Sequence, residues 1–130
     1  MKFSIALFSA PYHPSSRRAL CFAKAVLERQ HEIVRLFFYQ DSVYNASSSI
    51  VTPQDELDLP SSWSKLIEQY QLDSVVCISA ALRRGVLNAE EAKRYERSSS
   101  ITNQSWCLSG LTQLHEAHQI ADRLICFGGS

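Results

Sequence analysis

The sequence predicts an α/β protein, a three-layer α/β/α sandwich built on a mostly parallel sheet of four to five strands. Two observations support this class. Short runs of β-branched and aromatic residues alternate along the chain with stretches whose apolar residues recur at helical spacing. The run Ser74-Val75-Val76-Cys77-Ile78 is also short, apolar and β-branched, which is typical of a buried parallel strand.

The first part of the chain contains two strands with a helix between them. Residues 2–9 are rich in β-forming side chains and end at a segment with two prolines, which cannot continue a strand. Ser15 or Ser16 offers an N-cap for a helix that extends to about residue 30. A second strand is expected over 32–39. This order of elements predicts a parallel pair with a right-handed crossover.

The rest of the chain continues the alternation. Residues 40–60 are polar and are expected to form a long loop with a helical turn at 41–44. Ser61 or Ser62 then caps a helix that leads to the Cys77 strand. The remaining expected elements are a helix over 88–96, a stretch at 101–108 that fits a short strand, a helix over about 111–120 opened by Ser109 and Gly110, and a last strand over 122–127.

Size and composition predict a single domain covering residues 1–130. With 45% hydrophobic residues, a chain of this length forms one core and is too short for two ordinary domains. The 13 basic and 13 acidic residues balance, which argues against a global attraction to nucleic acid or anionic lipid. No apolar stretch approaches the ~20 residues that span a bilayer, and no cleavage pattern follows the first strand. We therefore expect a soluble cytoplasmic protein.

The four cysteines are the first candidates for a functional site. They form no C-x-x-C pair, which argues against structural zinc and predicts free thiols in a reducing compartment. No metal or other cofactor is expected. Cys126 lies within the last strand and Cys21 beside the apolar face of the first helix, so both are expected to be packing residues. Cys107 precedes a helix start and is a second candidate thiol, whose role stays open.

Cys77 is the strongest candidate for a nucleophile. It ends a strand and is followed by a helix-forming, basic segment, so it lies at the edge where α/β sheets perform chemistry. The amides of the following helix and the guanidinium groups of Arg83 and Arg84 favour a thiolate there. We therefore expect a thiolate that is reachable from outside. The alternative interpretation is core packing, since free cysteine is among the most buried residue types.

Two hydrolase interpretations fit Cys77 less well than persulfide chemistry. A Cys-His hydrolase needs a base, and among the histidines His13 in the first rim loop is the one placed to approach the thiol. Cysteine phosphatases share the C-x5-R spacing of Cys77 and Arg83, but their phosphate loop uses glycine, and residues 78–82 contain none. A thiolate that accepts sulfane sulfur requires only ionisation and an approachable partner.

The chain resembles the DsrE family of small sulfur-relay proteins over essentially its whole length. The Cys77 segment is the strongest part of the resemblance, because it distinguishes the subunit with the active thiol from sister subunits that lack it. The segments that carry the resemblance are Ala10-Pro11-Tyr12, Phe37-Phe38-Tyr39 with Val43-Tyr44-Asn45-Ala46, Cys77-Ile78-Ser79-Ala80-Ala81-Leu82-Arg83-Arg84-Gly85, and Leu108-Ser109-Gly110-Leu111 with Glu116-Ala117 and Ala121-Asp122-Arg123.

This resemblance implies a sulfurtransferase subunit that acts in 2-thiolation of the wobble uridine of certain tRNAs. Cys77 would accept persulfide sulfur from a small TusA-like donor protein and pass it to a TusE-like acceptor. The resemblance also implies a heterohexamer with related TusB-like and TusC-like subunits, without direct binding of nucleic acid or membrane. A related branch of the family serves sulfur oxidation, although the segments above look closer to the tRNA relay.

The predicted site has one catalytic residue, Cys77. We expect support for the thiolate from Ser79, Arg83 and Arg84, and we expect Tyr12, His13 and Tyr39 at the rim of the site. A second hypothesis of another class is a non-catalytic interaction subunit whose cysteine is part of the core.

Overall fold

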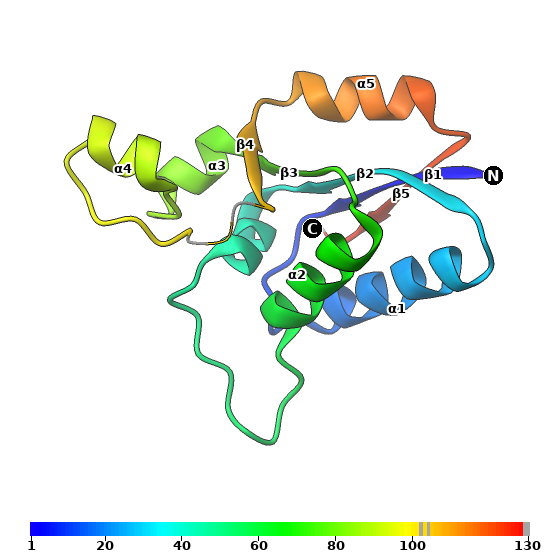
Figure 1. Ribbon diagram of the computed structural model, residues 1–130, viewed down its shortest axis with the longest axis horizontal. Helices are drawn as coiled ribbons and strands as arrows, with labels where there is room; N and C mark the ends of the chain where they lie inside the picture. The colour runs from blue at the N-terminus through cyan, green and yellow to red at the C-terminus, as the bar shows by residue number, and fades with distance from the viewer. Residues whose placement is uncertain (102, 104, 129–130) are drawn as a thin grey trace.

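Five parallel strands form the central sheet, in the spatial order β4-β3-β2-β1-β5 (Figure 1). The computed structural model describes residues 1–101, 103 and 105–128. The strands are β1 (Lys2–Leu7), β2 (Glu32–Phe38), β3 (Ser74–Cys77), β4 (Cys107–Ser109) and β5 (Arg123–Phe127). The parallel sheet expected from the sequence is confirmed. Within the stretch at 101–108, β4 begins only at Cys107, and residues 102 and 104 lie outside the described residues.

Helices cover both faces of this sheet and complete the predicted three layers. In Figure 1, α5 (Thr112–Ile120) lies above the sheet, whereas α1 (Pro14–Glu28) and α2 (Leu59–Tyr70) lie below it. The predicted turn after β2 is a 3-10 helix, η1 (Gln40–Ala46). Two short helices, α3 (Ile78–Arg83) and α4 (Ala89–Arg94), extend from the carboxyl end of β3 toward the left of the view.

The layer between the sheet and α2 contains a group of aromatic rings. Phe38 on β2 is fully buried, and its ring centre lies 5.5 Å from that of Trp63 and 4.9 Å from that of Trp106, both near perpendicular. Edge-to-face contacts of this kind contribute beyond the area they bury. These rings join β2, α2 and the segment before β4, and they fix the position of the strands on either side of Cys77.

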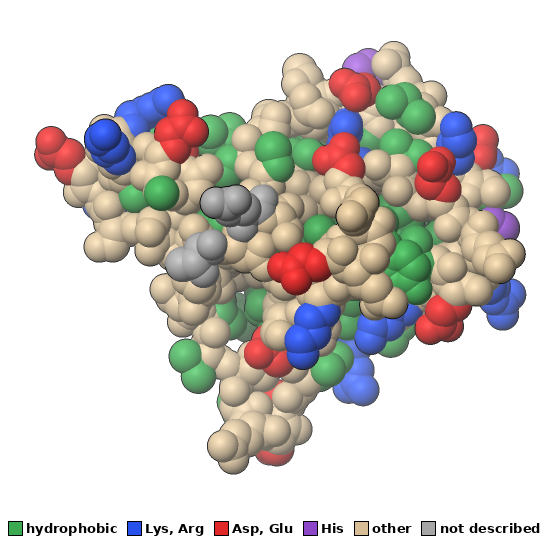
Figure 2. Space-filling model, viewed as in Figure 1, with side chains coloured by type: hydrophobic (Ala, Val, Ile, Leu, Met, Phe, Trp, Pro, Cys, Tyr) green, Lys and Arg blue, Asp and Glu red, His purple; other side chains and the backbone are tan. Residues whose placement is uncertain are grey.

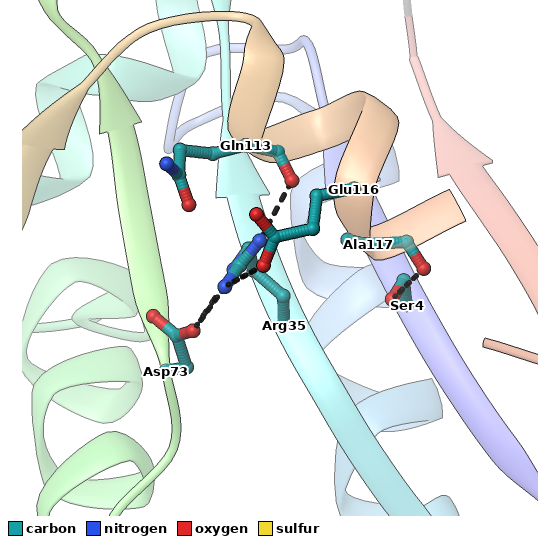
Figure 3. A network of polar contacts seen from close by, with 6 residues as sticks. All are labelled: Ser4, Arg35, Asp73, Gln113, Glu116 and Ala117. Atoms are coloured by element: carbon teal, nitrogen blue, oxygen red, sulfur yellow. Dashed lines mark hydrogen bonds and ion pairs between the residues drawn. The ribbon is translucent and has the colours of Figure 1, made fainter. Parts of the chain in front are cut away.

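The layer between the sheet and α5 contains a polar network around Arg35 (Figure 3). The Arg35 guanidinium lies 2.7 Å from Asp73 and 3.5 Å from Glu116, and it donates to the Gln113 carbonyl at 2.8 Å. Ser4 on β1 donates to the Ala117 carbonyl at 3.2 Å. Because Arg35 is on β2, Asp73 precedes β3 and the other partners are on α5, the network ties the helix to the sheet.

The strand register brings the carboxyl ends of the first three strands to one edge. Leu7 pairs with Phe38, Phe38 pairs with Val76, and Cys77 pairs with Ser109 on β4. The segments that follow β1, β2 and β3 therefore leave the sheet at the same side. This is the edge at which parallel α/β sheets place their sites.

Strand alternation assigns Cys77 to the α5 face of the sheet. Arg35 contacts α5, so Phe37 and Tyr39 project to the same side, and the rings of these two are stacked 6.4 Å apart. Val75 pairs with Phe37, and residues paired in a parallel sheet share a face. Cys77, two residues after Val75, therefore shares this face as well.

The first helix begins earlier than the sequence predicts. Its N-cap is His13, not Ser15 or Ser16, and the His13 ring nitrogen accepts the Ser15 amide at 3.2 Å. Pro14 occupies the first turn, where the amide of an ordinary residue has no partner inside the helix. Ser16 is instead buried and donates to the Ala10 carbonyl at 2.7 Å.

The second helix also begins earlier than predicted, because a proline again lies in its first turn. Asp58, rather than Ser61 or Ser62, is the N-cap, and its carboxylate accepts the Ser61 amide at 3.1 Å. Pro60 lies in the first turn and needs no amide partner there. In both cases a proline that would interrupt the middle of a helix lies in its first turn.

Candidate functional site

Cys77 is the last residue of β3 and the N-cap of α3. Its backbone is extended, with φ of −61° and ψ of 117°, so the chain passes directly from strand to helix at this residue. Ile78, Ser79 and Ala80 form the first turn of α3. The structure therefore places Cys77 at the carboxyl end of a parallel strand, as the sequence predicts.

The expected accessibility of Cys77 is not observed. The residue is 1% exposed and belongs to the main hydrophobic core together with Val76, Ala80 and Ala81. The expectation failed because it considered only the position of Cys77 along the strand. The turn into α3 and the packing of this helix on η1 and β4 cover the strand end.

Ser79 is the hydrogen-bond partner of the Cys77 thiol. The Cys77 Sγ and the Ser79 Oγ are 3.4 Å apart, a sulfur hydrogen bond in which either group can donate. Ser79 itself is exposed. The buried thiol therefore contacts an exposed polar side chain in the first turn of α3, a helix of six residues. Of the residues predicted to support the thiolate, Ser79 is the one in contact with Cys77.

The two arginines predicted to support the thiolate have other surroundings. Arg84 forms an ion pair with Asp41 at 2.9 Å and donates to the Ala80 carbonyl at 3.1 Å, which joins α3 to η1. Arg83 is exposed and lines a cavity of about 550 Å³ with Tyr95 and Arg97. In the part of the chain that the structure describes, no hydrogen bond joins either guanidinium to Cys77.

The predicted rim residues fall into two groups. Tyr39 follows β2, the neighbour of β3, and its ring packs edge-on against Phe8 at 5.9 Å. Tyr12 and His13 follow β1, and β2 separates this strand from β3. Both line a cavity of about 350 Å³ with residues 55–57 of the long loop. The structure therefore brings Tyr39 to the Cys77 end of the sheet and leaves Tyr12 and His13 two strands away.

Neither hydrolase interpretation finds support in this geometry. His13 is the N-cap of α1 and pairs with Ser15 at 2.7 Å, so it is engaged on the far side of β2. A phosphatase loop needs amides that converge on one anion. The residues from Ile78 to Arg83 instead form helix α3, in which successive amides follow the helix axis.

The other three cysteines are exposed, and all four are free thiols. The prediction that Cys21 and Cys126 are packing residues is therefore wrong. Cys21 projects from the outer side of α1, and Cys126 lies on β5, an edge of the sheet with little cover. Cys107 is on the opposite edge strand, β4, next to the strand of Cys77.

Sequence reasoning missed one residue near the site, Asp41. Its carboxylate forms the ion pair with Arg84, a residue 43 positions further along the chain. The signal available in the sequence was an acidic residue in the predicted turn after the second strand, but nothing in the pattern indicated its partner. Figure 2 shows acidic and basic side chains intermixed on the face in view, including those over α4 at its left. This agrees with the balanced composition.

Each helix of the described residues is too short or too polar to cross a membrane.

Comparison with known proteins gives a consistent result. The sequence matches the DsrE/DsrF-like family over residues 1–127. It is 63% identical over 129 residues to a protein of Pseudomonas aeruginosa named sulfurtransferase TusD homolog, covering 99% of this chain and 98% of that one. It is 45% identical to the putative sulfurtransferase DsrE of Allochromatium vinosum, covering 98% and 99% of the two chains.

More distant relatives agree with these. The sulfurtransferase TusD of Proteus mirabilis is 38% identical over 123 residues, covering 93% of this chain and 95% of that one. Among solved structures, the ychN protein of E. coli superposes with a TM-score of 0.76 at 19% identity, covering 98% and 99% of the two chains. At that identity the structural match shows a shared fold.

Proposed function

The chain belongs to the DsrE/DsrF-like family, and from this premise we propose that it is a sulfurtransferase that carries sulfane sulfur as a persulfide on Cys77. The relatives named as sulfurtransferases support this activity across the full length of the chain. The observation that carries the assignment to one residue is the position of Cys77. It is the cysteine at the carboxyl end of a central strand, and it contacts an exposed hydroxyl.

The proposed reaction has two balanced steps. The Cys77 thiolate attacks the outer sulfur of a donor persulfide, the donor's sulfur–sulfur bond breaks, and the donor leaves as a thiolate. Cys77 then holds the sulfur as a persulfide that keeps the proton of the transferred group. An acceptor thiolate attacks this outer sulfur in the same way and regenerates Cys77. Neither step consumes an oxidant or a reductant.

The first step requires that the buried thiol become accessible. We propose that the first turn of α3 moves when a donor docks, because Ser79 is exposed and α3 has only six residues. Movement of this turn as a unit uncovers the Sγ atom and keeps the Ser79 hydroxyl, now 3.4 Å away, beside it. The serine hydroxyl then donates to the thiolate, which stabilises the nucleophile.

The finer proposal places this chemistry in a relay between proteins. A TusA-like protein is the proposed donor and a TusE-like protein the proposed acceptor, within a heterohexamer that includes TusB-like and TusC-like subunits and serves tRNA wobble-uridine 2-thiolation in the cytoplasm. Relatives named TusD support this branch. Exposed apolar residues on the loop after η1, Ile50, Val51 and Leu57, and two on α5 and its start, Leu111 and Ile120, support association with other chains.

A direct loading experiment tests the proposed activity. The protein is incubated with a cysteine desulfurase, cysteine and a TusA-like carrier, and its intact mass is measured. The expected result is added mass corresponding to sulfur atoms, lost on treatment with a reductant. Cys77→Ser should abolish it, whereas Cys21→Ser, which removes an exposed thiol on α1, should not. Loading retained in Cys77→Ser, or absent from the unmodified protein, would reject the assignment.

A second candidate function is favoured by one observation, the burial of Cys77. If this thiol is only a core residue, the protein is a non-catalytic interaction subunit. In that case Cys77→Ser loads no less sulfur than the unmodified protein, and Cys77→Ala preserves any effect of the protein on its partners.

A further inference from the structure

Cys107 lies diagonally across from Cys77, on the neighbouring strand and on the same face of the sheet. In the parallel pairing of β3 with β4, Val75 is opposite Cys107 and Cys77 is opposite Ser109. Paired residues share a face, and so do residues two apart on one strand, so both thiols project to the α5 side. They differ in exposure, because Cys77 is buried and Cys107 is exposed.

The register also determines how far apart the two cysteines are. One strand spacing and two residues of rise place their Cα atoms about 8 Å apart. Disulfides require Cα atoms within about 7 Å, so a direct bond between these thiols does not fit. A sulfur atom in transit between two thiols adds one further sulfur–sulfur link to the span. The pair is therefore spaced for sulfur transfer and not for a disulfide.

From this arrangement we infer that Cys107 is a second catalytic thiol, which takes the sulfane sulfur from Cys77 and presents it at the surface. The inference rests on the proposed persulfide function of Cys77. The Cys107 thiolate attacks the outer sulfur of the Cys77 persulfide, and the bond between the two sulfurs on Cys77 breaks. A new sulfur–sulfur bond forms on Cys107, the proton stays on the transferred sulfur, and Cys77 leaves as a thiolate.

This step gives each cysteine a task that its surroundings suit. A persulfide held at Cys77 is shielded from water and from unrelated thiols, because that residue lies in the core. A persulfide on Cys107 is open to an acceptor without further movement of α3, since β4 is an edge strand and this thiol is exposed.

Cys126 provides a matched control within the same chain. It is also an exposed cysteine on an edge strand, and it pairs with Ala6 on the α5 face of the sheet. It lies on β5, and β1 and β2 separate that strand from β3. This corresponds to about 14 Å from the strand of Cys77, which is too far for direct transfer.

The experiment follows the sulfur by peptide mapping. The protein is loaded with a limiting amount of persulfide donor, quenched with an alkylating reagent at successive times and cleaved at lysine and arginine. The four cysteines fall in separate peptides, residues 19–24, 66–83, 98–123 and 124–130. The extra sulfur should appear first on the Cys77 peptide and then on the Cys107 peptide. The Cys126 peptide should carry at least about tenfold less, because it lacks the proximity.

Two variants distinguish the relay from other routes. In Cys107→Ser, which should fold normally because the side chain is exposed, sulfur should accumulate on Cys77. In Cys77→Ser, the Cys107 peptide should carry at least about tenfold less extra sulfur than it does in the unmodified protein. Sulfur that stays on Cys77 in the unmodified protein overturns the relay but keeps the proposed function. Equal labelling of Cys107 and Cys126, or full labelling of Cys107 in Cys77→Ser, also overturns the relay, whereas labelling nowhere rejects the proposed function itself.

Discussion

The Sγ atom of Cys77 lies 3.4 Å from the Oγ atom of Ser79. Cys77 is buried, whereas Ser79 is exposed. Either group can donate in this hydrogen bond, and the serine becomes the donor once the thiol ionises. The proposed transfer at Cys77 requires the first turn of α3 to move, which makes that turn the most informative place for mutation.

Alkylation rates should separate Cys77 from the other cysteines. In the native protein, iodoacetamide should modify Cys21, Cys107 and Cys126 at least about tenfold faster than Cys77, because reaction requires access to the sulfur. Peptide mass spectrometry over time measures the four rates separately. Denaturant should make the four rates similar, and a Cys77 that reacts as fast as Cys107 without denaturant would contradict the burial seen in the structure.

Ser79→Ala should slow sulfur uptake without weakening the fold. The variant loses the proposed hydrogen bond from the Ser79 hydroxyl to the thiolate, worth about 1.5 kcal/mol, or about tenfold in rate. The measurement is the initial rate of persulfide formation, with thermal unfolding as the check on stability. Ser79→Thr keeps the hydroxyl and should recover most of the rate. A rate unchanged in Ser79→Ala would mean that the hydroxyl has no part in the transfer.

Asp73→Ala should lower the free energy of unfolding by about 1 to 2 kcal/mol. Arg35 is largely buried, and this change removes its shortest ion pair while leaving the guanidinium in place. The expected loss is moderate because solvent screens the Asp73 carboxylate, which is 48% exposed. Urea unfolding measures the loss. The control is Glu116→Ala, which removes the longer contact of 3.5 Å and should cost less than about 0.5 kcal/mol.

Phe38→Ala should be the most destabilising of these substitutions, by about 3 to 5 kcal/mol. The ring is fully buried and contacts both Trp63 and Trp106, so its removal leaves a cavity between β2 and α2. Chemical denaturation followed by tryptophan fluorescence reports both the stability and the changed surroundings of the indoles. Phe8→Ala, at a half-buried ring near the same sheet edge, should cost clearly less.

Gly128→Ala should destabilise the protein by about 1 to 2 kcal/mol. The residue has φ of +83°, and an added Cβ would lie 1.9 Å from the Ser9 Oγ, so both backbone and side chain would have to shift. Gly110→Ala is the matched control, since no atom lies within 4 Å of its Cβ position and its φ is not in the left-handed region. Equal stability of the two variants, measured by thermal unfolding, would contradict this explanation.

The elements of the fold were predictable because each depends on local pattern. The β-branched run before Cys77 and the apolar spacing of the first helix are short-range signals, and both elements appear where they were expected. The start of the first helix was not predictable, because His13, Ser15 and Ser16 can each serve as an N-cap in the sequence. Only the packed structure selects among them, through contacts such as Ser16 with Ala10.

The candidate site was predictable in its position and not in its surroundings. The placement of Cys77 at a strand end follows from the sequence, whereas its burial depends on where α3 and η1 pack. The partner of Arg84 is 43 residues away, and the nearness of Cys107 depends on strand order, which a single sequence does not state. Contacts between distant segments are therefore what the structure adds.

The β4 edge of the sheet limits how another chain can join there. β4 has three residues, so this edge strand offers few unpaired backbone amides and carbonyls. A neighbouring chain that extended the sheet by adding a strand to β4 would gain little hydrogen bonding. The exposed thiol on β4 is therefore more readily reached through side-chain contacts than through an added backbone ladder.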